Sequence, residues 1–144
     1  MINFRPATPK DIPIIEDLLS RVNLPTNEVD PQKHAFFVGE EDRKVVVTAG
    51  LEVFGKSGLL RSVAVAPELQ SKGLGGQMYK FVMEKIRATD LREVWLLTTT
   101  AEKFFGKLGF EKRKREEAPP DIQNSWQFEH GACHSASVMC YLLS

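Results

Sequence analysis

Apolar residues recur at helical spacing in two stretches of the chain. The first stretch follows a capping-box-like start at Thr8, Pro9 and Asp11, which predicts a helix that ends near Arg21. The second follows a cluster of glycines and predicts a helix that ends near Ala88. The positions that define this spacing are Ile12, Ile15, Leu18, Leu19 and Val22 in the first stretch, and Met78, Phe81, Val82, Lys85 and Ile86 in the second.

Runs of β-branched and aromatic residues between turn residues predict strands. Gly55 to Gly58 predicts a four-residue hairpin loop between two of them. Thr99 and Glu102 are expected to cap a short helix that ends at Leu108. Residues 114–136 are polar and have no clear period. The expected strands are 2–5, 35–40, 45–54, 59–65, 93–98, 110–113 and 137–143.

The order of these elements predicts a mixed α+β fold, with one sheet and helices on both of its faces. Antiparallel strands come first, and a strand–helix–strand crossover occupies residues 59–98. No repeat and no long linker divides the chain. We therefore expect a single domain over residues 1–144, which is long enough to bury a core.

Composition narrows the classes of partner. The chain has 19 basic and 19 acidic residues, and this balance argues against a broad nucleic-acid surface. No apolar run approaches a membrane span, and the N-terminus has no apolar signal segment. The two cysteines, Cys133 and Cys140, have no framework spacing, so we expect a reduced, cytoplasmic protein.

The stretch LRSVAVAPELQSKGLGG, residues 60–76, combines a strand, a glycine-rich turn and a helix start. The glycines would let backbone amides of Ser71 to Gly76 point into one concavity at a helix N-terminus, which attracts phosphate. Lys72 would add a positive charge. The pattern is neither the nucleotide P-loop nor GxGxxG. The alternative is a plain strand-to-helix turn.

Two motifs in this chain resemble the GCN5-related N-acetyltransferase (GNAT) family. Val65-x-Pro67-x-x-Gln70-x-x-Gly73-x-Gly75 is similar to the family's acyl-CoA signature, whose turn holds the CoA pyrophosphate. The segment from Ala101 to Phe110, AEKFFGKLGF, is similar to the family's late helix and its closing Gly-Phe. The resemblance implies a mostly antiparallel sheet that splays between its fourth and fifth strands, with helices on both faces.

A narrower resemblance covers most of the chain. Segments such as Leu24-Pro25-Thr26, Gly50-Leu51-Glu52 and Leu97-Thr98-Thr99-Thr100 look like a subgroup associated with arsenic-resistance operons. That subgroup is similar to the acetyltransferase domain of N-acetylglutamate synthases. The tail around Gln127-Phe128, Ser135, Val138 and Met139 shares this likeness.

The family resemblance implies acetyl-CoA as cosubstrate, with no metal. Pantetheine would lie between the splayed strands, and an amide of the fourth strand, that of Val63 or its neighbour, would polarise the thioester carbonyl and stabilise the oxyanion. Trp95 to Thr98 would form the other side. The implied cofactor-binding residues are Val63, Ala64, Val65, Gln70, Ser71, Lys72, Gly73, Leu74, Gly75, Gly76, Thr98 and Phe105.

Two positions depart from the family pattern. Thr98 stands where the family has an asparagine, and Phe105 stands where it commonly has the tyrosine that protonates the thiolate. Releasing a thiol with a pKa near 8.5 as thiolate at pH 7 costs only about 2 kcal/mol, so transfer is compatible with phenylalanine. Water, Ser62 or one of Thr98 to Thr100 could assist. The departure also leaves open a non-catalytic CoA-binding module.

The acceptor is expected to be a small molecule with an α-amine, such as an amino acid or an analogue. Deprotonating an α-amine at pH 7 costs about 1.4 kcal/mol or less, against roughly 4.6 kcal/mol for a lysine-like amine, and the chain offers no obvious strong base. Counting back from a Gly55–Gly58 loop places Glu52 opposite Arg61. Arg61 would bind an acidic group, and Glu52 would bind the ammonium or accept its proton.

Alternatives to this acceptor site stay open. Glu52 and Arg61 would also fit a surface ion pair worth under about 1 kcal/mol. A protein or peptide N-acetyltransferase is a further reading, and a homodimer is left open.

Four residues near the C-terminus raise the question of a metal. His130, Cys133, His134 and Cys140 lack paired ligand spacing, so we expect neither zinc nor arsenite capture there. His34 is interpreted as structural. Trp95 and Trp126 are interpreted as packing residues, although Trp126 could line an acceptor pocket.

Overall fold

The structure is a computed structural model that describes residues 2–131 and 136–143. The strands of the described residues are β1 (Asn3–Pro6), β2 (Ala35–Glu41), β3 (Lys44–Phe54), β4 (Ser57–Val65), β5 (Glu93–Thr98), β6 (Glu111–Arg113) and β7 (Ser137–Leu142). The helices are α1 (Ile12–Arg21), α2 (Leu74–Arg87), α3 (Glu102–Lys107) and α4 (Pro120–Gln123). Short helical turns are η1 (Pro9–Asp11), η2 (Pro67–Leu69), η3 (Arg115–Glu117) and η4 (Gln127–Gly131).

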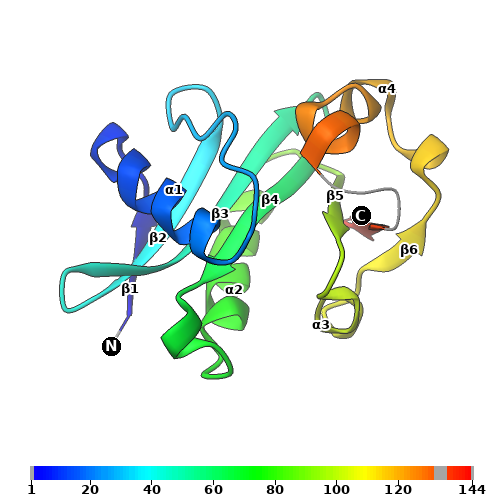
Figure 1. The fold of residues 1–144 in the computed structure, drawn as a ribbon. Helices are drawn as coiled ribbons and strands as arrows, with labels where there is room; N and C mark the ends of the chain where they lie inside the picture. The colour runs from blue at the N-terminus through cyan, green and yellow to red at the C-terminus, as the bar shows by residue number, and fades with distance from the viewer. Residues whose placement is uncertain (1, 132–135, 144) are drawn as a thin grey trace. The chain divides into compact units, whose positions relative to one another are not determined.

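The strands form a mixed sheet in the order β1-β2-β3-β4-β5-β7-β6, which can be traced by colour in Figure 1. The pairs β1–β2, β2–β3, β5–β7 and β6–β7 are antiparallel, whereas β4 and β5 are parallel. The parallel register joins Ser57–Leu59 to Glu93–Trp95, at the beginning of both strands. Both strands continue past this register, as expected for a sheet that splays between its fourth and fifth strands.

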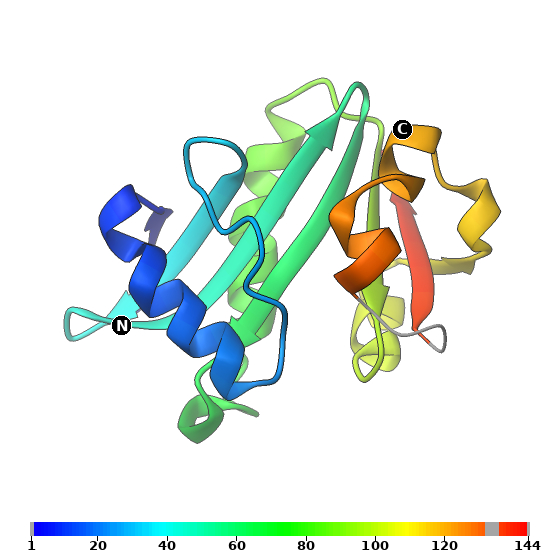
Figure 2. The same cartoon turned by 45° about the horizontal axis from the view of Figure 1, so that its top comes forward.

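The chain divides into two compact units, and the first comprises residues up to Glu52 and residues 62–89. In it, α1 and α2 cover opposite faces of the sheet around β2 and β3 (Figure 2). Phe81 of α2 stacks on Phe4 and meets Phe37 edge-on, with ring centroids 5.6 and 5.8 Å apart. Six of the residues that the helical spacing predicts are buried: Ile15, Leu18, Leu19, Met78, Val82 and Ile86. Ile12, Val22 and Phe81 are only partly buried, and α2 also buries Leu74 and Met83, which the spacing does not predict.

The second unit comprises residues 53–61 and 90–144. Its core includes residues from the region 114–136, whose polar sequence has no clear period. Ile122 of α4 is fully buried and Phe128 of η4 is 7% exposed. The core cluster consists of Leu59, Trp95, Ala118, Ile122, Phe128, Val138 and Cys140.

Three local predictions are wrong. Helix α2 begins at Leu74 rather than after the glycines, so Gly75 and Gly76 lie in its first turn. The hairpin loop is shorter than expected, because β3 ends at Phe54 and β4 begins at Ser57. At α3, the side chain that accepts a backbone hydrogen bond is not that of Thr99: Thr98 Oγ1 accepts from the Ala101 amide at 2.9 Å.

Candidate functional site

The turn between β4 and α2 is built by its own backbone and by one side chain. Gln70 Nε2 donates to the Val65 carbonyl at 3.2 Å, which ties the turn to the end of β4. Ser71 and Gly73 both have left-handed backbones, with φ of 71° and 82°. These two reversals bring the chain to the helix start at Leu74.

This turn has the features of an anion-binding site. The first hydrogen bond of α2 joins the Gln77 amide to the Gly73 carbonyl at 3.1 Å, so the amides before Gln77 have no acceptor within the helix. A Cβ placed at Gly73 or Gly76 would meet nothing within 4 Å, which leaves room for a ligand to approach the backbone. Gln70 to Gly73 are exposed, and Lys72 among them carries a positive charge. Amide donors, a helix dipole and a lysine together favour a phosphate group.

Strand β4 changes its backbone conformation just before the residues assigned to the thioester. Ser62 has a φ of 56° within the strand, which is unusual for a non-glycine residue. Val63 and Val65 are partly exposed, whereas Ala64 is buried. A left-handed residue inside a strand interrupts the regular alternation of the peptide groups, so Val63 follows an irregularity rather than a uniform strand.

In the second unit, Phe105 and Thr98 have structural contacts. Phe105 is 7% exposed, and its ring meets those of Phe104 and Phe110 edge-on at 5.0 and 5.5 Å. Thr98 Oγ1 already accepts the Ala101 amide. Phe105 therefore packs in an aromatic cluster of α3, where it has no proton to donate.

Glu52 and Arg61 are both buried, at 2% and 4% exposure. Their interpretation as a surface ion pair is therefore wrong. The prediction that Glu52 lies opposite Arg61 was counted from a Gly55–Gly58 hairpin loop. The loop is shorter in the structure, so that count no longer applies. Each takes part in further interactions. Burying a charged group is costly unless it is compensated, so each of these side chains has a specific environment inside the protein.

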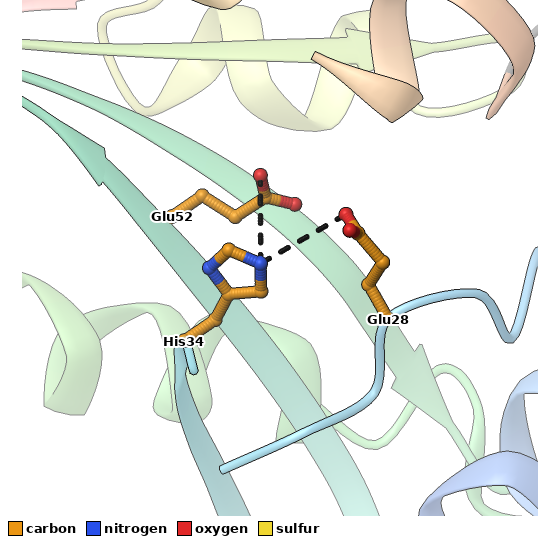
Figure 3. Close-up of side chains that lie close together, drawn as sticks. All are labelled: Glu28, His34 and Glu52. Carbon is orange, nitrogen blue, oxygen red and sulfur yellow. Dashed lines mark ion pairs between the residues drawn. The ribbon is translucent and has the colours of Figure 1, made fainter. Parts of the chain in front are cut away.

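A cluster that the sequence reading did not find surrounds His34. Figure 3 shows its imidazole pointing toward the carboxylates of Glu28 and Glu52. His34 Nε2 lies 3.9 Å from Glu28 Oε2 and 3.9 Å from Glu52 Oε1. Nε2 is buried and has no hydrogen-bond partner among the described residues. No local motif signals this group, since its members come from a connection, a strand entry and β3.

The C-terminal cysteine and histidine residues are only partly covered by the structure. Cys133, His134 and Ser135 lie outside the described residues. His130 is exposed in η4, with its ring 5.7 Å from that of Trp126. Cys140 is 1% exposed within β7, and desolvation by burial raises the pKa of its thiol to about 12. Among the described residues, no helix has the length and apolar character needed to cross a bilayer.

Comparison with curated proteins finds amino-acid acetyltransferases. The protein of Ralstonia nicotianae is 32% identical over 96 residues, which are 64% of this chain and 21% of that protein. The protein of Aeromonas salmonicida is 26% identical over 134 residues, which are 85% of this chain and 30% of that protein. The chain thus spans less than a third of the length of these relatives.

Solved structures share the fold. An N-acetylglutamate synthase from Neisseria gonorrhoeae, complexed with coenzyme A and N-acetyl-glutamate, superimposes with a TM-score of 0.85 at 21% identity, over 100% of this chain and 35% of that one. A GNAT-family acetyltransferase from Staphylococcus aureus superimposes with a TM-score of 0.79 at 15% identity and covers both chains fully.

A model of the acetyltransferase (GNAT) domain matches residues 32–112, which is more than half of the chain. The matched segment contains both motifs on which the resemblance depends, the turn after β4 and the α3 region. Together with the parallel β4–β5 pair, this match confirms the family expected from the sequence. The chain belongs to the GNAT acetyltransferase family.

Proposed function

We propose that this chain is an acetyl-CoA-dependent N-acetyltransferase whose acceptor is the amino group of a small amino acid or a close analogue. The observation that carries the proposal is the turn from Gln70 to Gly76, whose first four residues are exposed. It combines amides without helical acceptors, a lysine and unobstructed glycines. These features suit the pyrophosphate of CoA.

In this proposal the turn binds the pyrophosphate, and β4 orients the acyl group. The remaining cofactor residues are Val63, Ala64 and Val65 from β4, Thr98 from β5 and Phe105 from α3. The amide of Val63 donates to the thioester carbonyl, and this hydrogen bond strengthens as negative charge develops on the oxygen. The family match and the solved relative that contains coenzyme A support this assignment.

The acceptor proposal draws on charge and on the relatives. Arg61 is a buried guanidinium, whose planar set of donors matches a carboxylate. Glu52 is a buried carboxylate that suits an ammonium. The curated relatives are amino-acid acetyltransferases, and the Neisseria structure contains N-acetyl-glutamate. Deprotonating an α-amine at neutral pH also costs less than deprotonating a lysine-like amine.

The test is the release of free CoA thiol from acetyl-CoA with a panel of amino acids, peptides and polyamines. We expect turnover with one or more amino acids bearing an acidic group. Arg61→Ala should raise the KM of that acceptor much more than the KM of acetyl-CoA. Arg92→Ala removes an exposed arginine and serves as the control. Efficient acetylation of peptides or polyamines, with none of any amino acid, contradicts the proposal.

Phe105 favours a second candidate, a CoA-binding module without transfer. A phenylalanine in an aromatic cluster cannot protonate the departing thiolate. The two candidates differ in one measurement, because a binding module would bind CoA at the turn and release no thiol with any acceptor.

A further inference from the structure

The Glu28–His34–Glu52 cluster brings two carboxylates and an imidazole nitrogen to one point. The ligand atoms of the three side chains all lie within 4.8 Å of one another. Glu52 is almost fully buried, with 3% of its side chain exposed, His34 has 14% exposed and Glu28 has 33%. The cluster thus runs from the interior at Glu52 to the solvent at Glu28.

His34 Nε2 is the unusual atom of this group. Both carboxylate oxygens are 3.9 Å from it, which is too far for a direct hydrogen bond. The atom is nevertheless buried, and buried polar atoms in proteins almost always have a partner. The geometry therefore suits a small polar group that contacts Nε2 and both carboxylates at once.

The separations distinguish an amino group from a metal ion. An amino nitrogen would lie about 2.9 Å from each of two acceptor atoms that are 3.9 Å apart, so the angle between its two hydrogen bonds would be roughly 85°. This angle is about 25° from tetrahedral, a deviation that hydrogen bonds tolerate. A zinc ion at about 2.1 Å from the same two atoms would need a ligand–zinc–ligand angle of roughly 135°, whereas zinc sites are tetrahedral. The cluster would have to contract around zinc, whereas it accepts an ammonium group with little adjustment.

The surrounding charges also favour a cation. Glu28 Oε1 accepts from Lys33 Nζ at 2.8 Å, while its other oxygen, Oε2, faces His34. The backbone of His34 is also fixed, since its amide donates to the Asp30 carbonyl at 2.9 Å. Among the described residues, the carboxylates of Glu28 and Glu52 lie within ion-pair distance of the imidazole, and Lys33 pairs with Oε1 of Glu28. Glu28 and Glu52 have other interactions as well, so a ligand would share them.

We propose that this cluster binds the amino group of the acceptor, and that His34 Nε2 takes the proton that the amine must lose before attack. The proposal rests on the proposed N-acetyltransferase function and names the proton acceptor for it. Glu28 and Glu52 hold the ammonium, and neutral His34 removes one proton, leaving the nitrogen lone pair free.

The proton balance of the step is complete. The amine lone pair forms the new C–N bond at the thioester carbonyl, and the C–S bond breaks with its electron pair on sulfur. The second amine proton goes to the thiolate, so the products are the amide and the CoA thiol. Protonated His34 returns the first proton to solvent past Glu28, whose side chain is a third exposed.

The first experiment uses steady-state kinetics on the full chain with an amino acid that is acetylated. His34→Gln should lower kcat/KM for the acceptor by about 10²-fold or more, while the KM of acetyl-CoA stays within about twofold. Glu28→Gln should raise the acceptor KM by about tenfold. His130→Gln and Glu84→Gln make the same changes at exposed positions and should have no effect. Circular dichroism verifies the fold of each variant, and His34→Asn serves where His34→Gln does not fold.

The second experiment does not depend on turnover. Imidazole ring resonances of His34, identified by their loss in His34→Gln, should shift when an amino acid is added and should not shift with its N-acetylated form, which lacks the ammonium. Turnover with unchanged His34→Gln kinetics and no such shift overturns the inference and leaves the proposed function intact. A shift without any thiol release supports the amine site and rejects the proposed function. Stabilisation by Zn²⁺ alone in wild type but not in His34→Gln, without a response to amines, overturns the inference in favour of a metal.

Discussion

Gly73 allows the ligand-binding role of the turn to be separated from its structural role. Its φ is 82°, and a Cβ there would meet no atom within 4 Å. Gly73→Ala therefore adds backbone strain without a clash. A left-handed alanine costs about 1–2 kcal/mol, partly offset by about 0.4–1 kcal/mol from the less flexible unfolded chain. We expect a net loss of roughly 1 kcal/mol, or about 2–4 °C in melting temperature for a chain of this length.

Gly55 provides a matched control for this substitution. It has a φ of 62° and open space around its Cβ position, and it lies in the β3–β4 hairpin loop. Gly55→Ala should lose about the same stability in a thermal melt. In isothermal titration, Gly73→Ala should weaken CoA binding at least about tenfold, or about 1.4 kcal/mol, whereas Gly55→Ala should leave it within about twofold.

Gly76 tests the same idea with the opposite effect on stability. It lies in the first turn of α2 with open space around it, so Gly76→Ala should stabilise the helix by up to about 1 kcal/mol and still weaken CoA binding. Gly106→Ala in α3 is its control. Unchanged CoA affinity in both Gly73→Ala and Gly76→Ala would refute a close approach of the pyrophosphate to this backbone.

Three further predictions concern other parts of the chain. Phe105→Tyr should leave kcat similar or modestly higher, and a rise in kcat beyond about 10²-fold would show that a missing acid limits the wild type. Phe105→Ala should lose about 3–5 kcal/mol of stability in urea unfolding. Hydrogen bonds from Arg5 lower the pKa of Asp11 to about 2, from an ordinary value of 3.8, so its ionised form adds at most about 2 kcal/mol above pH 4. That contribution should disappear between pH 4 and pH 2, and Asp11→Asn should lack this pH-dependent part in urea unfolding at each pH. Cys140, with a pKa of about 12, should resist alkylation at pH 8 until urea unfolds the protein, and rapid labelling of its peptide in the folded state would contradict this.

The elements best predicted from the sequence are those with an unbroken local pattern. The strand expected at 93–98 has those bounds in the structure, because EVWLLT is a short apolar run whose central residues Val94, Trp95 and Leu96 are buried. The end of α1 at Arg21 was also predicted correctly. The sequence predicts too late a start for α2. Glycine has a low helix propensity, so the sequence pattern does not indicate that Gly75 and Gly76 belong to the helix.

Residues 114–136 illustrate what a local pattern cannot convey. Their helices are single turns, too short for a period, and they depend on tertiary packing of residues such as Ile122 and Phe128. The cluster around His34 was missed for a related reason. Its three members lie in a connection, a strand entry and a strand and form no sequence motif, so only the fold brings them together.

The interleaving of the two compact units has a consequence for synthesis on the ribosome. The first unit has all of its sequence once Thr89 has been translated, but by then residues 53–61 have also been made, and they belong to the second unit. Leu59, which is 1% exposed in the finished protein, packs with residues from 95 onward that do not yet exist. A nascent chain stopped after Thr89 would carry this apolar hairpin without its core, a state that favours aggregation or chaperone binding. Fragments for expression therefore cannot be cut at a unit boundary, because no single cut separates the two units.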